Sequence, residues 1–238
     1  KNVWYKIHKP DVYSESALSE FERSIMETGN EIELVARKLF PTGILIERRD
    51  AKGQEATQDY IAKKQEVLFQ PIFVKDGYLA AIDILKFEPE TKDYSVYEIK
   101  STSSVDEKVH YHDLAFQINL LRKCGLKINK AYLIHLNSEY VRSGELDIAQ
   151  LFKIVDVSSE VKSVFESVTV ETEEALKYLS QGSEPKGFCC CIYKGRSRHC
   201  STFQHANPEI PEYSVHDIAR IGNSKAKLKE LIDNNIFH

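Results

Sequence analysis

The chain has 238 residues, of which 42% are hydrophobic and 29% are charged, and its formal net charge is -4. Such a composition is typical of a globular protein that can bury a sizeable core. A slightly acidic chain has no global positive field. This argues against a tight, nonspecific coat on nucleic acid and leaves local basic patches for such contacts.

No apolar run approaches the roughly 18 residues of a membrane span, and the opening stretch "KNVWYKIHKPDVY" lacks the apolar core of a secretory signal. We therefore expect a cytoplasmic protein with no membrane partner. Because the sequence opens at Lys1 rather than at Met, we also expect flanking domains in the full-length protein.

The first predicted element is an amphipathic helix from about Ser19 to Phe40, because its apolar residues recur at helical spacing and Pro41 follows as a stop. Four short β-rich runs come next, separated by Gly, Asp and Pro signals. They cover residues 42–48, 66–74, 77–87 and 93–101. We interpret them as consecutive strands of one sheet.

The second half alternates helices and strands. We expect a helix over Tyr111–Gly125 with the glycine as a left-handed cap, strands over 130–137 and 151–158, and helices over Glu160–Leu179 and Ser224–Ile232. The stretch "QGSEPKG" between them has the composition of a linker. The order of elements predicts an α/β fold with a central mixed sheet flanked by helices. In this interpretation residues 1–180 form the core, and a cysteine-containing segment, 181–238, packs on it.

One acid lies in the apolar run "AAIDILKF" and another in the strand "SVYEIK". Strand side chains alternate between faces, so Glu98 and Lys100 project together, and Asp83 joins them if the two strands pair. Two carboxylates buried together are costly unless a cation or hydrogen bonds compensate, and Mg²⁺ prefers carboxylate oxygens. The same pattern also arises on a solvated face with a cross-strand ion pair, so the spacing alone leaves both interpretations open.

Four of the five cysteines fall within twelve positions, at Cys189, Cys190, Cys191 and Cys200. An intracellular compartment disfavours structural disulfides, whereas thiolates are ligands of both zinc and iron-sulfur clusters. A zinc site would use Cys191 and Cys200 with His199 or His205. Free cysteines in a small folded tail are the third interpretation.

From about Trp4 to Cys200 the chain resembles the PD-(D/E)xK nuclease superfamily, specifically the RecB-like exonuclease branch that includes the CRISPR-associated iron-sulfur nucleases. The sheet motif is matched by Asp83 and Glu98-Ile99-Lys100, and the helix motif by Gln117 in "DLAFQINLL", although Leu121 stands where the family often has an aromatic residue. The family commonly places a metal-binding histidine four residues after a glycine on its first helix. Here Glu33 stands four residues after Gly29, with Glu31 close by.

The resemblance implies a restriction-endonuclease-like core in which Mg²⁺ or Mn²⁺ is held by Asp83, Glu98, the Ile99 carbonyl and either Glu31 or Glu33. Lys100 would help to activate water, and Gln117 would support the lysine or DNA. The implied activity is metal-dependent hydrolysis of phosphodiester bonds, as an exonuclease on DNA that is single-stranded or has free ends. A non-catalytic DNA-binding or scaffold module that retains the nuclease fold is the alternative.

For the cysteines, the resemblance implies a [4Fe-4S] cluster that uses the C-terminal set, Cys189, Cys190, Cys191 and Cys200. The family takes one further ligand near its N-terminal edge. Since no cysteine precedes Cys124 here, the resemblance places that ligand upstream of Lys1.

Overall fold

The computed structural model describes residues 1–13 and 20–238 and divides the chain into two compact units. One unit is Ser19–Glu173, and the other combines Lys1–Leu18 with Glu174–His238. This differs from the predicted division, in which the N-terminal residues belong to the core and the second part begins at residue 181. Ser19, the expected start of the first long helix, lies outside the described residues.

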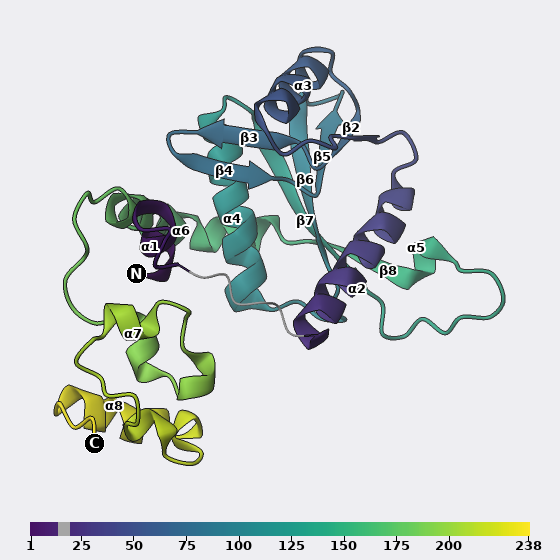
Figure 1. The fold of residues 1–238 in the computed structure, drawn as a ribbon. Helices are drawn as coiled ribbons and strands as arrows, with labels where there is room; N and C mark the ends of the chain where they lie inside the picture. The colour runs from purple at the N-terminus through teal and green to yellow at the C-terminus, as the bar shows by residue number, and fades with distance from the viewer. Residues whose placement is uncertain (14–19) are drawn as a thin grey trace. The chain divides into compact units, whose positions relative to one another are not determined.

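The unit Ser19–Glu173 is built on a six-stranded sheet with the order β1-β2-β5-β6-β7-β8 (Figure 1). The β1-β2 and β6-β7 pairs are parallel and the other three pairs are antiparallel, so the predicted α/β class with a mixed central sheet is confirmed. The strands are β1 (Ile44–Leu45), β2 (Val67–Phe69), β5 (Ile84–Glu88), β6 (Asp93–Lys100), β7 (Ile128–Leu136) and β8 (Phe152–Asp156).

Two of the predicted strands are each interrupted in the middle. The run 66–74 breaks at Gln70 and Pro71 into β2 and β3 (Ile72–Lys75), and the run 77–87 breaks at Ile82 and Asp83 into β4 (Tyr78–Ala81) and β5. The β3-β4 pair forms a separate two-stranded sheet, so the expectation of a single sheet is wrong for these segments.

The two breaks face each other. The Gln70 N–H donates to the Asp83 carbonyl at 3.2 Å, and the Ile82 N–H donates to the Pro71 carbonyl at 3.0 Å. Gln70 has a φ of 53°, a left-handed conformation that is uncommon for a residue with a side chain, and Pro71 has no N–H to give to a ladder. The chain therefore bends where Gln70 and Asp83 lie side by side.

Helices cover both faces of the six-stranded sheet (Figure 1). On one face, α4 (Glu107–Lys123) and the first part of α6 (Ser158–Leu179) bury a cluster that includes Leu114, Leu121 and Val161 against strand residues such as Val96. On the other face, α2 (Glu20–Ala36) ends in a 3-10 turn, Arg37–Leu39, and packs against strand residues beside α5 (Ile148–Leu151). Gly125, two residues past the end of α4, has a φ of 89°, which confirms the predicted left-handed cap.

Another helix of this unit, α3 (Ala51–Ala62), was not predicted from the sequence. Its start is capped by Asp50, whose carboxylate accepts from the Gly53 N–H at 3.1 Å. A side chain at position 53 would meet the Arg48 carbonyl at 1.9 Å, so only glycine fits this close approach. The helix is tied to β3 by Thr57, whose hydroxyl accepts from the Ile72 N–H at 3.0 Å.

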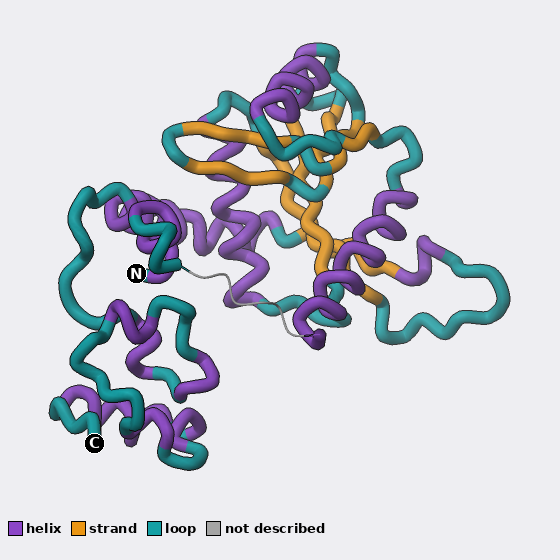
Figure 2. The backbone as a smooth tube through the Cα atoms, in the orientation of Figure 1, coloured by secondary structure: helices purple, strands orange, loops and turns teal. Residues whose placement is uncertain are grey.

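The other unit is mainly helices and 3-10 turns without a strand among its described residues (Figure 2). The end of α6 and α8 (Lys225–Asp233) confirm two predicted helices, whereas α1 (Asn2–His8) was not predicted. Its core includes Trp4, Tyr5, Ile192 and Leu228. The remaining elements are α7 (Phe203–Ala206) and the 3-10 turns at Cys190–Tyr193, Arg196–Arg198, Val215–Asp217 and Ile221–Asn223.

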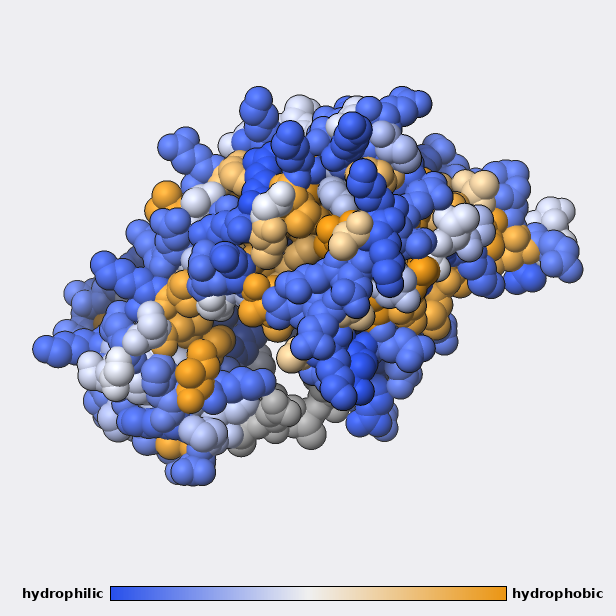
Figure 3. Space-filling model, turned by 90° about the horizontal axis from the view of Figure 1, so that it is seen from above, coloured by the Kyte–Doolittle hydropathy of each residue, from blue (hydrophilic) through white to orange (hydrophobic). Residues whose placement is uncertain are grey.

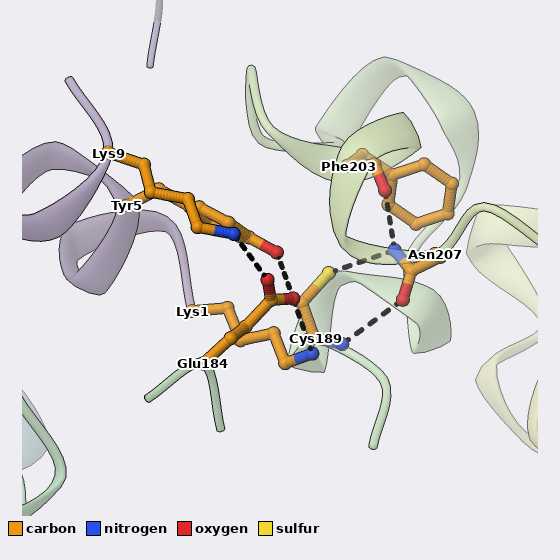
Figure 4. A network of polar contacts seen from close by, with 7 residues as sticks. All are labelled: Lys1, Tyr5, Lys9, Glu184, Cys189, Phe203 and Asn207. Atoms are coloured by element: carbon orange, nitrogen blue, oxygen red, sulfur yellow. Dashed lines mark hydrogen bonds and ion pairs between the residues drawn. The ribbon is translucent and has the colours of Figure 1, made fainter. Parts of the chain in front are cut away.

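Glu184, in the predicted linker, connects α1 to the C-terminal part of this unit (Figure 4). Its carboxylate accepts from the Tyr5 hydroxyl, from Lys9 Nζ at 2.9 Å and from Lys1 Nζ at 3.5 Å. The Tyr5 and Lys9 hydrogen bonds lower the pKa of Glu184 to about 2. Burial and the same Glu184 bond raise the pKa of Tyr5.

We expect Glu184→Gln to destabilise this unit by about 1 kcal/mol at neutral pH, because the three donors lose their charged acceptor and the carboxylate is only partly shielded from solvent. A depressed carboxyl pKa stabilises the folded state above the unfolded pKa, and this stability is lost as the pH falls toward 2. Thermal unfolding from pH 7 to pH 3 should therefore show the difference between wild type and variant narrowing below about pH 4. The exposed acid Glu209, changed to Gln, is the control. A difference that persists unchanged at pH 3 would contradict this assignment.

No helix among the described residues is long and apolar enough to cross a membrane. The face seen in Figure 3 is largely hydrophilic, and its hydrophobic side chains gather in patches bordered by hydrophilic ones.

Candidate functional site

The β5-β6 hairpin carries the predicted acidic motif. Glu98 and Lys100 lie on the same face of β6, and Glu98 is 8% exposed. Lys100 Nζ lies 3.0 Å from Glu98 Oε1 and 2.8 Å from Asp113 Oδ2. Burial by itself would lower the pKa of Lys100, but the two carboxylates outweigh it and raise that pKa above its ordinary value. Lys100 is therefore a fixed positive charge at neutral pH.

Asp83 lies at the break just before β5 and is held by two donors. Its Oδ2 accepts from the Ile99 N–H at 2.8 Å, and its Oδ1 accepts from Gln70 Nε2 at 3.0 Å. Burial, followed by the neighbouring charges of Glu98 and Glu33, raises the pKa of Asp83 to about 8. Two negative carboxylates in this setting are costly, so the cation-free protein keeps a proton on Asp83 near neutral pH.

Of the two glutamates considered as the metal-binding residue of the first long helix, Glu33 is the one near the acidic motif. This residue lies near the end of α2, and its Oε1 accepts from Gln70 Nε2 at 2.6 Å and from the Arg37 guanidinium. Glu31 is exposed. Of the two glutamates left open by the sequence, only Glu33 is linked to Asp83, through the Gln70 amide.

Gln117 on α4 holds the other side of Glu98. Its Nε2 donates to Glu98 Oε2 at 2.7 Å, so both carboxylate oxygens of Glu98 face a donor. Gln117 is 9% exposed, and among the described residues its Oε1 is buried without a hydrogen-bond partner. A buried acceptor of this kind calls for a donor such as an ordered water.

The donor set fits a hard divalent cation. The Asp83 carboxylate, just before β5, and the Glu98 carboxylate, near the end of β6, lie close enough for the charge of Glu98 to raise the pKa of Asp83, and Mg²⁺ prefers such oxygens and keeps several of its own waters. The orphaned Gln117 Oε1 next to Glu98 would accept from one of these waters. Glu33 stands farther out, because the Gln70 amide lies between it and Asp83.

The cysteines form a second candidate site, in the other unit. The sulfurs of Cys189, Cys191 and Cys200 all lie within 4.8 Å of one another, and this is the only group of three or more potential metal ligands of that spacing among the described residues. Tetrahedral zinc with bonds of about 2.3 Å would separate its thiolates by about 3.8 Å. The three cysteines can therefore bind a metal ion with little rearrangement.

The buried side chain of Asn207 hydrogen-bonds to Cys189, the first cysteine of the group (Figure 4). Asn207 Oδ1 accepts from the Cys189 N–H at 3.1 Å, while its Nδ2 donates to Cys189 Sγ at 3.2 Å and to the Phe203 carbonyl at 2.7 Å. Burial, with the neighbouring thiols, raises the pKa of Cys191 to about 12, so its thiol is protonated until a metal binds.

Cys190 does not join the trio. It is exposed, while its neighbours Cys189 and Cys191 are buried, because three consecutive residues leading into a 3-10 turn cannot all point the same way. Neither histidine considered for zinc belongs to the group. His199 stacks on Phe203, and His205 meets the ring of Tyr5 edge-on.

Three residues that contact the acidic site were not predicted from the sequence. Gln70 and Asp113 contact the predicted acids and lysine directly, and Arg49 donates to Gln70 Oε1 at 3.2 Å. A signal existed for Asp113, since it precedes Gln117 by four residues and so shares its helix face. For Gln70 the signal was Pro71, which marks the break in the strand.

No protein-family model matches the chain, and no curated protein matches its sequence. The site is therefore interpreted from its own geometry.

Proposed function

We propose that the chain is a divalent-metal-dependent DNA nuclease of the RecB-like type, acting on single-stranded DNA or DNA with free ends. The observation that carries the proposal is the meeting of Asp83, Glu98 and Lys100 at one end of the β5-β6 hairpin. The arrangement of this hairpin within a mixed sheet, followed by α4, supports a restriction-endonuclease-like core.

Asp83, Glu98 and the Ile99 carbonyl would hold Mg²⁺ or Mn²⁺, with Glu33 at the outer edge. A cation bound there polarises a phosphodiester and lowers the pKa of a water. Gln117 fixes the Glu98 carboxylate, and Asp113 fixes the Lys100 ammonium. Held in this way, Lys100 presents positive charge where the phosphate gains negative charge during hydrolysis. Phosphate contacts carry no base identity, so we expect little sequence preference.

The cysteine trio would hold the metal centre of the second unit. The resemblance favours a [4Fe-4S] cluster, in which Cys189, Cys191 and Cys200 would supply three of four ligands. The short spacing of the sulfurs favours zinc. An absorption spectrum of anaerobically purified protein with elemental analysis decides between them, because an iron-sulfur cluster is coloured and zinc is not.

The nuclease proposal is tested on labelled linear single-stranded and double-stranded DNA with Mg²⁺ or Mn²⁺. We expect Lys100→Met to lower the hydrolysis rate on the order of 10²- to 10³-fold, because a fixed charge beside the reacting phosphate is lost. Lys86→Met is the matched control, since Lys86 pairs with Glu88 farther along β5.

Wild-type protein that cleaves neither DNA would overturn the proposal, as would Lys100→Met cleaving as fast as wild type. Binding of DNA without cleavage would instead favour the non-catalytic module.

A further inference from the structure

Gln70 lies at the break between β2 and β3 and has an unusual conformation for a glutamine. Its side chain is 6% exposed, its backbone is left-handed, and it stands where β2 and β5 separate from the β3-β4 hairpin. Strained positions of this kind persist when the surrounding structure holds them, and they gather at functional sites. The burial and backbone conformation of Gln70 therefore indicate a functional role for its side-chain amide.

The amide joins three side chains from different parts of the chain. Its Nε2 donates to Glu33 Oε1 at 2.6 Å and to Asp83 Oδ1 at 3.0 Å, while its Oε1 accepts from Arg49 at 3.2 Å. The orientation of the amide is fixed by chemistry, because an arginine only donates and a carboxylate only accepts. Arg49 thus turns the NH₂ group toward the two acids.

Glu33 has few other ties to the sheet. Its other partner is Arg37, four residues along the same helical stretch, so this ion pair cannot fix the carboxylate relative to Asp83. Gln70 is the link between the acid on α2 and the acid at the end of β5. Partners of this kind orient metal-binding carboxylates, and their loss weakens metal affinity.

We propose that Gln70 is a positioning residue for the divalent-cation site, which sets the approach of Glu33 to Asp83. The inference rests on the cation site proposed above. It adds Gln70, with Arg49 behind it, to the residues that determine how tightly that site binds its cation. Gln70 acts through the two carboxylates and is assigned no contact with DNA.

The test is titration of the full chain with Mn²⁺ in the absence of DNA, followed by the electron paramagnetic resonance signal of the free ion. We expect Gln70→Met, which keeps the length of the side chain and removes both hydrogen-bonding groups, to raise the dissociation constant about tenfold. Gln65→Met is the matched control, because the Gln65 amide donates to the Thr42 carbonyl and to neither acid. Thermal unfolding of each variant verifies that it is folded.

A double-mutant cycle with Glu33→Gln separates positioning from a general structural effect. If Gln70 acts through Glu33, the Gln70→Met change should weaken Mn²⁺ binding far less in the Glu33→Gln background than in wild type. Equal losses in both backgrounds would overturn the inference.

Mn²⁺ binding by Gln70→Met as tight as that of wild type, or tighter, would also overturn it, and tighter binding would mean that the amide competes with the cation. Either result leaves the nuclease proposal standing. Wild-type protein that binds no Mn²⁺ would instead remove the cation site and the inference together.

Discussion

Asp83→Asn is expected to abolish metal-dependent DNA hydrolysis, with a loss on the order of 10³-fold or more, and to make the cation-free protein more stable at pH 8. The activity falls because the side chain loses the charge that would hold the cation. The fold survives because an amide at this position still has an oxygen to accept from the Ile99 N–H, although its NH₂ group loses the hydrogen bond from Gln70 Nε2 and offsets part of the gain in stability.

The stability change follows from the raised pKa of Asp83. Its folded-state pKa of about 8 lies above the unfolded value, so the folded state binds more protons between about pH 4 and pH 8. Stability of the cation-free protein therefore falls as the pH rises through this window. The Asp83→Asn variant lacks this titrating group, so the stability of the variant should depend less on pH in this window. Added Mn²⁺ should stabilise wild type more at pH 8 than at pH 6, because cation binding needs the deprotonated acid.

The measurement is thermal unfolding at several pH values, with and without Mn²⁺, alongside the nuclease assay. Asp76→Asn is the control, since Asp76 lies exposed in the β3-β4 turn with a φ of 52°, a conformation that asparagine also tolerates. If the stability of Asp83→Asn depends on pH as steeply as that of wild type, Asp83 is not a buried acid that stays protonated near neutral pH. Undiminished hydrolysis would contradict its place in the cation site.

The second large effect is expected from the cysteine trio. Cys191→Ser should remove most of the metal bound per chain and lower the unfolding temperature of the unit that contains it, since a thiolate ligand is lost and metal binding contributes directly to folding free energy. Elemental analysis of the purified protein gives the metal content, and calorimetry gives the unfolding temperature.

Cys190 offers a close control for this experiment. It is the adjacent residue, it is exposed, and it lies outside the trio, so Cys190→Ser should retain both metal and stability. Equal metal loss in the two variants would show that the trio does not define the site. Wild-type protein purified anaerobically without metal would leave Cys189, Cys191 and Cys200 as thiols of the core.

Long, periodic segments were predictable from the sequence. The helices α4 and α6 and the mixed sheet follow from apolar spacing and a glycine cap, which depend on local chemistry. The helix α3 was missed because its polar composition carries a weak pattern, although its Asp50 cap could be found in the sequence.

The breaks at Gln70 and Asp83 could not be placed in advance, because they depend on how two distant segments pair. A left-handed backbone at a glutamine is imposed by the surrounding structure and has no signature of its own. For the same reason the sequence indicated Asp83, Glu98 and Lys100 as one group but left Glu31 and Glu33 open. Only the three-dimensional link through the Gln70 amide separates the two glutamates.

Lys100 is held by two carboxylates, and under the proposed nuclease function this pairing affects the order in which the cation and DNA would bind. Without a cation, the Lys100 ammonium lies between the Glu98 and Asp113 carboxylates, and the negative charges of Glu98, Asp113 and Glu33 lie close to where a polyanion would bind. A DNA strand that binds before the cation would be repelled by these carboxylates, and Lys100 would already be paired with Glu98 and Asp113. Asp83 and Glu98 would hold a cation that binds first, and its charge would offset theirs before a DNA strand approaches. Under the proposed nuclease function, the metal would therefore bind before DNA.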